Sequence, residues 1–217
     1  MSNVIILADF SGEQITKTTA ELATAGARIG TVTAIVIAEA GKGAARASQV
    51  KQGPISQVLV IEAAEFAEAG VPAVADALSQ IVKEKSPAAV LIASHAFGKE
   101  VAARVAVLTD SGIITDAVDV AADITATQMV FGGSTTVHSQ ISHGTPIITV
   151  RPNSIEADLN TASPAIENAT AVISDAAKKA KIASSQPPVK GGRPELTEAN
   201  IVVSGGRGTD EIGRAHV

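Results

Sequence analysis

Short apolar runs alternate with amphipathic helical patterns through the first half of the chain. Four of these runs are rich in Val, Ile, Leu and Ala and have the length of strands buried on both faces: Val4–Ala8, Val32–Ile37, Val58–Ile61 and Val90–Ala93. Strands that alternate with helices are joined by right-handed crossovers, which places the strands in a parallel sheet. The pattern therefore predicts a doubly wound, mostly parallel α/β domain.

The segments between these runs have the spacing of helices. Ser11 and Gln14 have the spacing of a capping box, and Gly26 is interpreted as the residue that ends this first helix. A second helix is expected to carry Pro72 in its first turn, where a missing N–H costs nothing. The apolar helical spacing that begins at Val101 predicts a third helix.

The pattern changes after Gly112, where the alternation typical of strands replaces the helical spacing. Residues 128–131, 136–141 and 147–150 are expected to be antiparallel strands that extend the sheet. Ala169–Ile173 is expected to add one more strand.

A stretch rich in Ser, Pro and Gly follows at residues 184–194, which is typical of a linker. We predict a first domain over residues 1–184, a linker over residues 185–199 and the start of a second α/β domain over residues 200–210.

The second domain is predicted from a β-branched run that leads into a glycine-rich turn. Ile201–Val203 has the composition of a buried strand, and the turn Gly205-Gly206-Arg207-Gly208 follows it. Glycines after a strand let backbone N–H groups approach a phosphate closely. Arg207 in such a turn can bind a pyrophosphate or an electron-rich ring, or it is a surface arginine in a flexible turn. The residues alone leave both interpretations open.

Composition narrows the classes of partner. The formal net charge of −5, from 17 basic and 22 acidic residues, argues against nucleic acid, as does the aromatic content of 2%. The chain has no cysteine, which excludes disulfides, thiolate metal sites and cysteine nucleophiles. No basic region or long apolar segment precedes the first strand, so we expect no signal peptide, no membrane insertion and a cytoplasmic location.

Candidate catalytic and metal-binding residues are few. Ser94 and His95 follow a predicted strand, where α/β folds place ligands, but neighbouring residues on an extended loop point apart and no acid partner is identified. His138 and His143 have no third metal ligand that the sequence nominates. We therefore predict no catalytic residue and no metal site. A small α/β hydrolase is disfavoured because no Gly-x-Ser-x-Gly motif occurs.

Two segments look like phosphate-binding loops but lack decisive residues. Phe97-Gly98-Lys99 ends like a Walker loop, but Ala93 stands at the first glycine position and Glu100 replaces the Ser or Thr that would hold magnesium. Gly41-Lys42-Gly43 has Arg46 where the dinucleotide fingerprint needs its third glycine. Both are interpreted as helix entries or turns, and we expect no nucleotide site in the first domain.

Three stretches together resemble the alpha subunit of electron transfer flavoprotein. They are the opening strand Val4–Asp9, Ser94-His95-Ala96-Phe97-Gly98-Lys99-Glu100 running into Ala103-Arg104-Val105-Ala106, and Val202-Val203-Ser204-Gly205-Gly206-Arg207-Gly208. They occur in the family's order and bracket residues 1–210. The resemblance implies a Rossmann-like domain of the adenine nucleotide alpha hydrolase-like kind with added antiparallel strands, followed by an incomplete second α/β domain.

The resemblance implies an electron carrier that performs no bond chemistry of its own and is therefore no enzyme. It implies a heterodimer with a beta subunit, and FAD held chiefly by the second domain of the alpha subunit. Electrons would pass from flavin dehydrogenases, such as the acyl-CoA dehydrogenases of fatty acid beta-oxidation, to the membrane quinone pool through a quinone oxidoreductase. By the same resemblance Arg207 contacts FAD, and Gly205, Gly206 and Gly208 form the backbone turn beside it.

The family's second domain is longer than residues 200–210, so most FAD contacts are expected to be missing from this chain. Residues 211–217, Glu-Ile-Gly-Arg-Ala-His-Val, match the translation of a common sequencing-library adapter and are interpreted as a non-native tail. The alternative function is a stand-alone nucleotide-binding or sensing α/β module with its ligand near Asp9 and Ser94.

Overall fold

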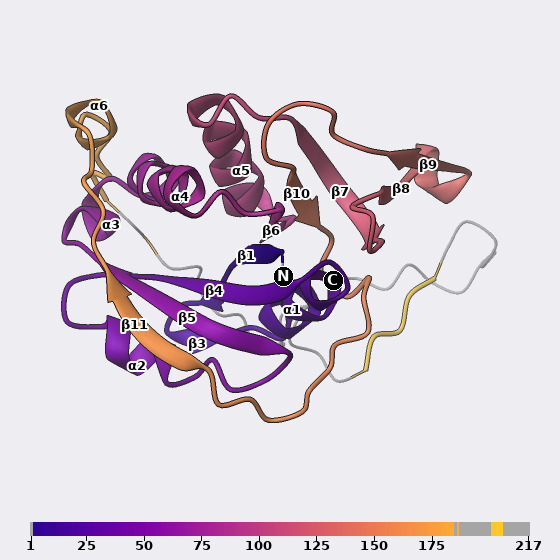
Figure 1. The fold of residues 1–217 in the computed structure, drawn as a ribbon, viewed down its shortest axis with the longest axis horizontal. Helices are drawn as coiled ribbons and strands as arrows, with labels where there is room; N and C mark the ends of the chain where they lie inside the picture. Colours follow the sequence, from indigo (N-terminus) through magenta and orange to yellow (C-terminus); the bar gives the residue numbers. More distant parts are fainter. Residues whose placement is uncertain (1, 185, 187–200, 206–217) are drawn as a thin grey trace. The chain divides into compact units, whose positions relative to one another are not determined.

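The computed structural model describes residues 2–184, 186 and 201–205. The chain divides into two compact units, Met1–Ile182 and Ala183–Val217, and every described helix and strand belongs to the first (Figure 1). None of the helices in the described residues combines the length and the apolar character that crossing a bilayer requires.

A nine-stranded sheet forms the centre of the first unit, in the order β11-β5-β4-β1-β6-β10-β7-β8-β9. The pairs from β11 to β7 are parallel, and β8 and β9 extend the sheet as an antiparallel arm. The strands are β1 (Asn3–Leu7), β4 (Thr31–Ala38), β5 (Ile55–Glu62), β6 (Ala89–Ala93), β7 (Ile113–Val120), β8 (Ala126–Val130), β9 (Thr135–Ser139), β10 (Ile147–Val150) and β11 (Ala165–Ala169). The four strands predicted from apolar runs are confirmed as β1, β4, β5 and β6.

Helices cover both faces of the sheet, which confirms the doubly wound α/β fold (Figure 1). One face carries α1 (Thr18–Ala27) and α2 (Gly43–Ala47), and the other carries α4 (Val71–Lys85) and α5 (Ala96–Leu108). The short helices α3 (Glu65–Glu68) and α6 (Asp175–Lys178) contact α4.

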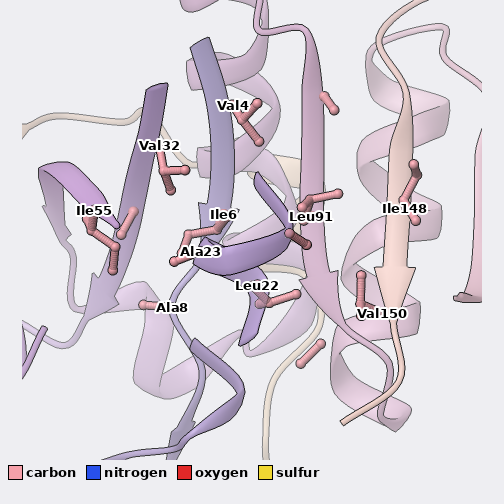
Figure 2. Close-up of a cluster of buried hydrophobic side chains, with 14 of the residues drawn as sticks. Val4, Ile6, Ala8, Leu22, Ala23, Val32, Ile55, Leu91, Ile148 and Val150 are labelled. Atoms are coloured by element: carbon pink, nitrogen blue, oxygen red, sulfur yellow. The ribbon is translucent and has the colours of Figure 1, made fainter. Parts of the chain in front are cut away.

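Successive residues of the central strands enter two different hydrophobic clusters, because side chains alternate across a strand. Val4 and Ile6 of β1 lie in the cluster beneath α1, whereas Ile5 belongs to the cluster beneath α4 and α5. Figure 2 shows the first cluster, in which Leu22 of α1 gathers with strand residues such as Leu91. Burial on both faces explains why these strands are continuous apolar runs in the sequence.

The first helix begins later than predicted. Ser11 and Gln14 face each other in a hairpin of β2 (Phe10–Ser11) and β3 (Gln14–Ile15), so the predicted capping box is wrong. The hairpin turn contains Gly12 at φ +60°, a left-handed conformation that glycine adopts without steric penalty. The helical segment then begins at Thr18.

Gly26 lies within α1 and does not end it, contrary to the prediction. A Cβ at this position would lie 3.1 Å from a methyl carbon of Val32 and 3.2 Å from one of Val4, so glycine permits close packing of α1 on the sheet. The predictions of Pro72 in the first turn of α4 and of a helix around Val101 are confirmed.

Two of the later strands differ from the predictions: β10 in its direction and β11 in the residues it includes. Ile147–Val150 forms β10, which is parallel and central, between β6 and β7, and all its residues are buried. An antiparallel role was expected because the sequence does not reveal that the chain returns to the sheet interior after the β8–β9 arm. The strand predicted at Ala169–Ile173 lies instead at Ala165–Ala169, where an exposed edge position removes the apolar pattern.

The described part of the second unit is short. Ile201, Val202 and Val203 are 83%, 54% and 93% exposed and lie outside any strand, and the start of a second α/β domain over residues 200–210 stays a prediction. Strand structure requires a neighbouring backbone to accept and donate hydrogen bonds, and none of the described residues supplies one.

Candidate functional site

The sheet reverses its winding between β1 and β6. From β1 the chain passes through α1 to β4 on one side, and from β6 it passes through α5 to β7 on the other side. In open α/β sheets, ligands bind outside the carboxyl ends of the strands at such a switch point. The residues that follow β1 and β6 are therefore the first candidates for a site.

Asp9 follows β1 and His95 follows β6, and their side chains meet at this switch point. His95 Nε2 lies 2.8 Å from Asp9 Oδ1, and the hydroxyl of Thr16 donates to Asp9 Oδ2 at 2.6 Å. His95 is also the N-cap of α5, where its Nδ1 accepts the backbone N–H of Gly98 at 3.1 Å. Since Nδ1 accepts, the ring proton sits on Nε2 and points toward Asp9.

These contacts shift the pKa of Asp9 and the pKa of His95. Burial alone raises the pKa of Asp9, but hydrogen bonds from His95 and Thr16 outweigh burial and hold this pKa below its usual value. The hydrogen bond to Asp9 raises the pKa of His95 against the opposite effect of burial. The pair therefore favours a carboxylate that is ionised at neutral pH.

A second polar cluster lies across the carboxyl ends of β6, β10 and β7. Ser94 Oγ donates to Asp116 Oδ1 at 2.7 Å and lies 2.9 Å from the hydroxyl of Thr149. That threonine hydroxyl accepts the N–H of Asp116 at 3.0 Å, and Lys99 Nζ donates to Asp116 Oδ2 at 2.7 Å. Asp116 has φ +57° where the pairing of β7 with β10 shifts register, a local irregularity of the kind that re-aims a side chain.

Both Ser94 and His95 thus have acid partners, which the sequence alone did not identify. Asp9 and Asp116 lie 86 and 22 residues away in the chain and come close only through the order of the strands. The two side chains do point to different partners, as expected. Because the Ser94 hydroxyl donates to a carboxylate and not to His95, the geometry provides no nucleophile–base pair.

A pocket of about 290 Å³ opens at the switch point. Apolar strand ends line part of it, including Leu7, Ile37 and Ile92. The ionisable side chains that line it are Asp9, Glu39, Arg46 and His95. The pocket combines an apolar surface with a few polar groups, which is the usual make-up of a small-molecule site.

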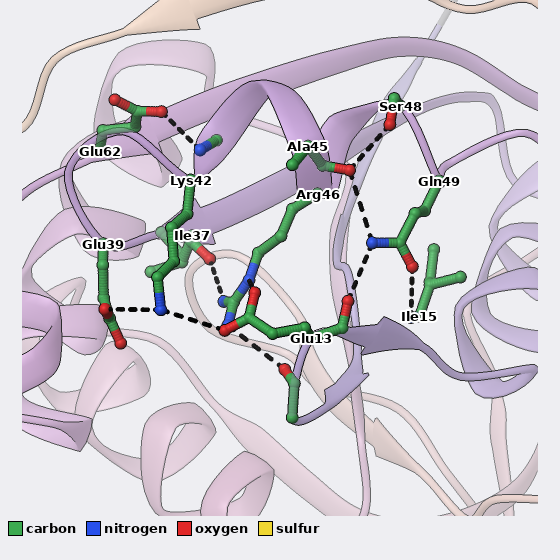
Figure 3. Close-up of polar contacts among 12 residues, drawn as sticks. Glu13, Ile15, Ile37, Glu39, Lys42, Ala45, Arg46, Ser48, Gln49 and Glu62 are labelled. Carbon is green, nitrogen blue, oxygen red and sulfur yellow. Dashed lines mark hydrogen bonds and ion pairs between the residues drawn. The ribbon is translucent and has the colours of Figure 1, made fainter.

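The two phosphate-loop look-alikes have structural roles. A Cβ on Gly98 would lie 2.0 Å from the carbonyl oxygen of Ala93, so this glycine allows the start of α5 to approach β6. The N–H groups of Gly41 and Gly43 donate to the two carboxylate oxygens of Glu62 at 3.1 and 2.5 Å. Figure 3 shows Glu62 with one of these two hydrogen bonds. The Glu62 carboxylate thus takes the place that a phosphate would need, and the interpretation of both segments as turns or helix entries is confirmed.

The two other histidines among the described residues lie apart from the pocket. His138 contacts the hydroxyl of Thr127 at 3.1 Å, and His143 contacts Asp110 at 3.2 Å on the surface. In the part of the chain that the structure describes, no three His, Cys, Asp or Glu side chains gather in a way that could hold a metal ion.

Comparison with known proteins decides the family. A sequence profile described as the electron transfer flavoprotein domain matches residues 4–185. The chain belongs to this family. The matched segment spans the α/β unit with its pocket and polar clusters, so these features occur on an electron transfer flavoprotein domain.

The relatives are alpha subunits. The chain is 35% identical over 209 residues to the electron transfer flavoprotein subunit alpha of Mycobacterium leprae, which covers 96% of this chain and 65% of the relative. It is 36% identical over 158 residues to the alpha subunit of Mycobacterium tuberculosis, an alignment that covers 73% of this chain and 50% of the relative. It is 31% identical over 214 residues to the alpha subunit of Syntrophomonas wolfei, an alignment that covers 96% of this chain and 66% of the relative. The chain thus spans about two thirds of the length of these relatives at most.

The residues assigned to the cofactor by resemblance belong to the second unit. Gly205 is described and exposed, whereas Gly206, Arg207 and Gly208 lie outside the described residues. The pocket at the switch point does not fit FAD, because about 290 Å³ is at the lower limit for a single drug-sized ligand and FAD carries two ring systems joined by a pyrophosphate.

Proposed function

We propose that this chain is the alpha subunit of an electron carrier that works as a heterodimer with a beta subunit in the cytoplasm. Electrons pass through FAD from flavin dehydrogenases, such as acyl-CoA dehydrogenases, to the membrane quinone pool by way of a quinone oxidoreductase. The chain itself makes and breaks no substrate bonds. One observation carries this proposal: relatives that match along 96% of the chain are alpha subunits of electron transfer flavoproteins.

The geometry of the first unit agrees with a carrier. Ser94 and His95 bind separate carboxylates, so the most suggestive catalytic pair of the sequence lacks the arrangement that nucleophilic catalysis needs. The family match also favours the carrier over a stand-alone nucleotide-sensing module.

FAD is the cofactor of the proposal, and Arg207 with Gly205, Gly206 and Gly208 is the part of its site that this chain would supply. FAD supplies the reversible uptake of electrons when it is bound. An arginine beside glycine N–H groups would bind the anionic or electron-rich part of the cofactor and fix its position.

Coexpression of the 217-residue chain with the beta subunit of a close relative tests the proposal. We expect the two chains to copurify as a 1:1 complex after affinity capture and size-exclusion chromatography. The matched control is coexpression with an unrelated α/β protein of similar size. Failure of the chain to bind the beta subunit, while the chain alone is folded by circular dichroism, would contradict the proposed assembly.

A further inference from the structure

The antiparallel arm formed by β8 and β9 has an open strand edge. β9 is the last strand in the sheet order, and among the described residues it pairs with β8 alone (Figure 1). Alternate backbone N–H and C=O groups of an edge strand point away from its neighbour and can pair with another chain. Of the five β9 residues, three are exposed and two are half-buried, so the side chains of the strand are also accessible.

The arm carries almost no charge. Residues 124–150 contain no Asp, Glu, Lys or Arg, although these residue types make up 18% of the chain. The edge strand at the other end of the sheet, β11, differs, because Pro164 precedes it and the exposed Glu167 lies within it. Natural sheets use such charges and prolines to prevent pairing between edges. β9 has neither, so nothing of this kind opposes pairing at its edge.

The sequence of β9 is complementary to itself in the antiparallel direction. When Val137 lies at a two-fold axis, Thr136 stands opposite His138 of a second copy. In the same register Thr135 stands opposite Ser139 of the second copy. Pairs of small hydroxyl side chains across two strands form stabilising hydrogen bonds.

A pair of threonine and histidine already stabilises the arm. Thr127 of β8 stands opposite His138 of β9, and its hydroxyl lies 3.1 Å from Nδ1 of the ring. Within the described part of the chain this is the side-chain hydrogen bond of His138, and it leaves Nε2 for the Thr136 hydroxyl of a second copy. The same kind of pair can therefore form on both sides of β9.

The tip of the arm exposes apolar side chains. Phe131 is 84% exposed and Met129 is 46% exposed. Phe131 also has φ +51°, a left-handed conformation that costs a residue with a side chain about 1–2 kcal/mol. Antiparallel pairing of two arms places the tip of each beside the base of the other, which removes Phe131 from water.

We propose that two copies of this chain associate through the outer edges of their β9 strands, paired antiparallel with Val137 at the two-fold axis. Each copy has a formal net charge of −5, and none of this charge lies in residues 124–150. Repulsion between the copies therefore comes from outside the interface, and salt weakens it. Because β9 has only five residues, the interface is small, and we expect a Kd in the micromolar range. The proposal goes beyond the heterodimer proposed above and does not rest on it.

Sedimentation velocity of the full 217-residue chain, without a beta subunit, tests the association between micromolar and millimolar concentration. We expect a monomer–dimer equilibrium that shifts toward the dimer as salt is added. Thr136→Lys should raise the Kd about tenfold or more, because it removes two cross-strand pairs and brings two lysines within diagonal reach. Asn168→Lys adds the same charge to the exposed edge strand β11, is the matched control and should leave the Kd unchanged.

The register is tested by cross-linking. The chain has no cysteine, so a single introduced cysteine reports which residues meet. The two Val137 residues would face each other at a separation that suits a disulfide, whereas the two Thr135 residues would lie more than about 13 Å apart. Under mild oxidation Val137→Cys should form a covalent dimer, and Thr135→Cys, at an exposed position of the same strand, should form much less. Cross-linking at position 135 that equals or exceeds that at position 137 would overturn the proposed register.

Circular dichroism establishes that each variant is folded. A chain that stays monomeric near millimolar concentration would overturn the proposal, as would an equal rise of the Kd in the Thr136 and Asn168 variants. A monomeric chain whose capture of the beta subunit is abolished by Thr136→Lys would assign this edge to that subunit and would also overturn pairing with a second copy. Because the self-association is measured without the beta subunit, its failure and the failure of the heterodimer are distinguishable.

Discussion

His95 Nε2 lies 2.8 Å from Asp9 Oδ1 and connects the chain that follows β6 with the chain that follows β1. The same ring accepts the N–H of Gly98 through Nδ1, so one imidazole joins the end of β1 to the first turn of α5. The ring is 40% exposed, which makes it both a structural link and part of a pocket surface.

Replacement of His95 tests this link. His95→Ala removes the cap of α5 and the partner of Asp9, and we expect the free energy of unfolding to fall by about 1–2 kcal/mol in urea denaturation. His95→Asn keeps a side chain that caps helices well but is too short for Asp9, so its loss should be smaller. His143→Ala is the control, because His143 is 71% exposed and surface changes usually stay within about 0.5 kcal/mol. Equal losses for His95→Ala and His143→Ala would contradict the structural role.

The sequence predicted the strands that are buried on both faces, because burial on both faces leaves an uninterrupted apolar run. Val4–Ala8 and Val90–Ala93 coincide with β1 and β6 to within one residue at each end. β11 was misplaced because it is an edge strand whose residues are mostly exposed. The direction of β10 was missed because a short apolar run fits a strand of either direction.

The candidate site was predictable only in part. The sequence shows that Asp9 and Ser94-His95 each follow a strand, and the ends of parallel strands share an edge of the sheet. It does not show that β1 and β6 are neighbours, because that depends on which side of the sheet each crossover takes. The place of Asp116 in the site was even harder to predict from the sequence, since its approach to Ser94 depends on a register shift and a left-handed backbone conformation.

Asp116 should make stability depend on pH in the acid range. The hydrogen bond from Lys99 lowers the pKa of Asp116, against burial and with help from Ser94. A carboxyl whose pKa is lower in the folded state stabilises the protein above its unfolded pKa of about 3.9, and this contribution is lost as pH falls through the folded pKa. Asp116→Asn removes the contribution of this carboxyl and leaves that of others, such as Asp9.

Urea denaturation of both proteins between pH 7 and pH 3 measures this effect. We expect a constant difference between wild type and Asp116→Asn above about pH 5, of no more than about 1 kcal/mol because the pair is partly exposed. The difference should shrink below about pH 4. A difference that stays constant to pH 3 would argue against the ion pair with Lys99.

The centre of the sheet should tolerate loss of volume poorly. Leu91 of β6 is fully buried in the cluster beneath α1, with strands on both sides. Leu91→Ala is expected to reduce the free energy of unfolding by about 2–5 kcal/mol, through lost burial and the cavity that remains. Val107→Ala on α5 removes apolar atoms from a side chain that is 81% exposed and should change stability by less than about 0.5 kcal/mol. Similar values for the two variants would contradict the packing described for β6.

The flavin role of Arg207 is tested by restoring the length of the relatives. We expect the 217-residue chain to retain little FAD, because one glycine-rich turn cannot enclose a flavin, and its absorption spectrum after purification should lack the flavin bands.

A chimera of residues 1–210 with the remaining third of the Mycobacterium leprae relative, coexpressed with that relative's beta subunit, should be yellow. In this chimera Arg207→Ala should raise the FAD dissociation constant about tenfold or more, as expected for loss of a charge-assisted contact. Arg104→Ala, which removes an exposed arginine paired with Glu100 on α5, is the control and should leave FAD affinity unchanged. Strong flavin absorption from the 217-residue chain alone would refute the first expectation, and equal FAD affinity in the two arginine variants would remove Arg207 from the site.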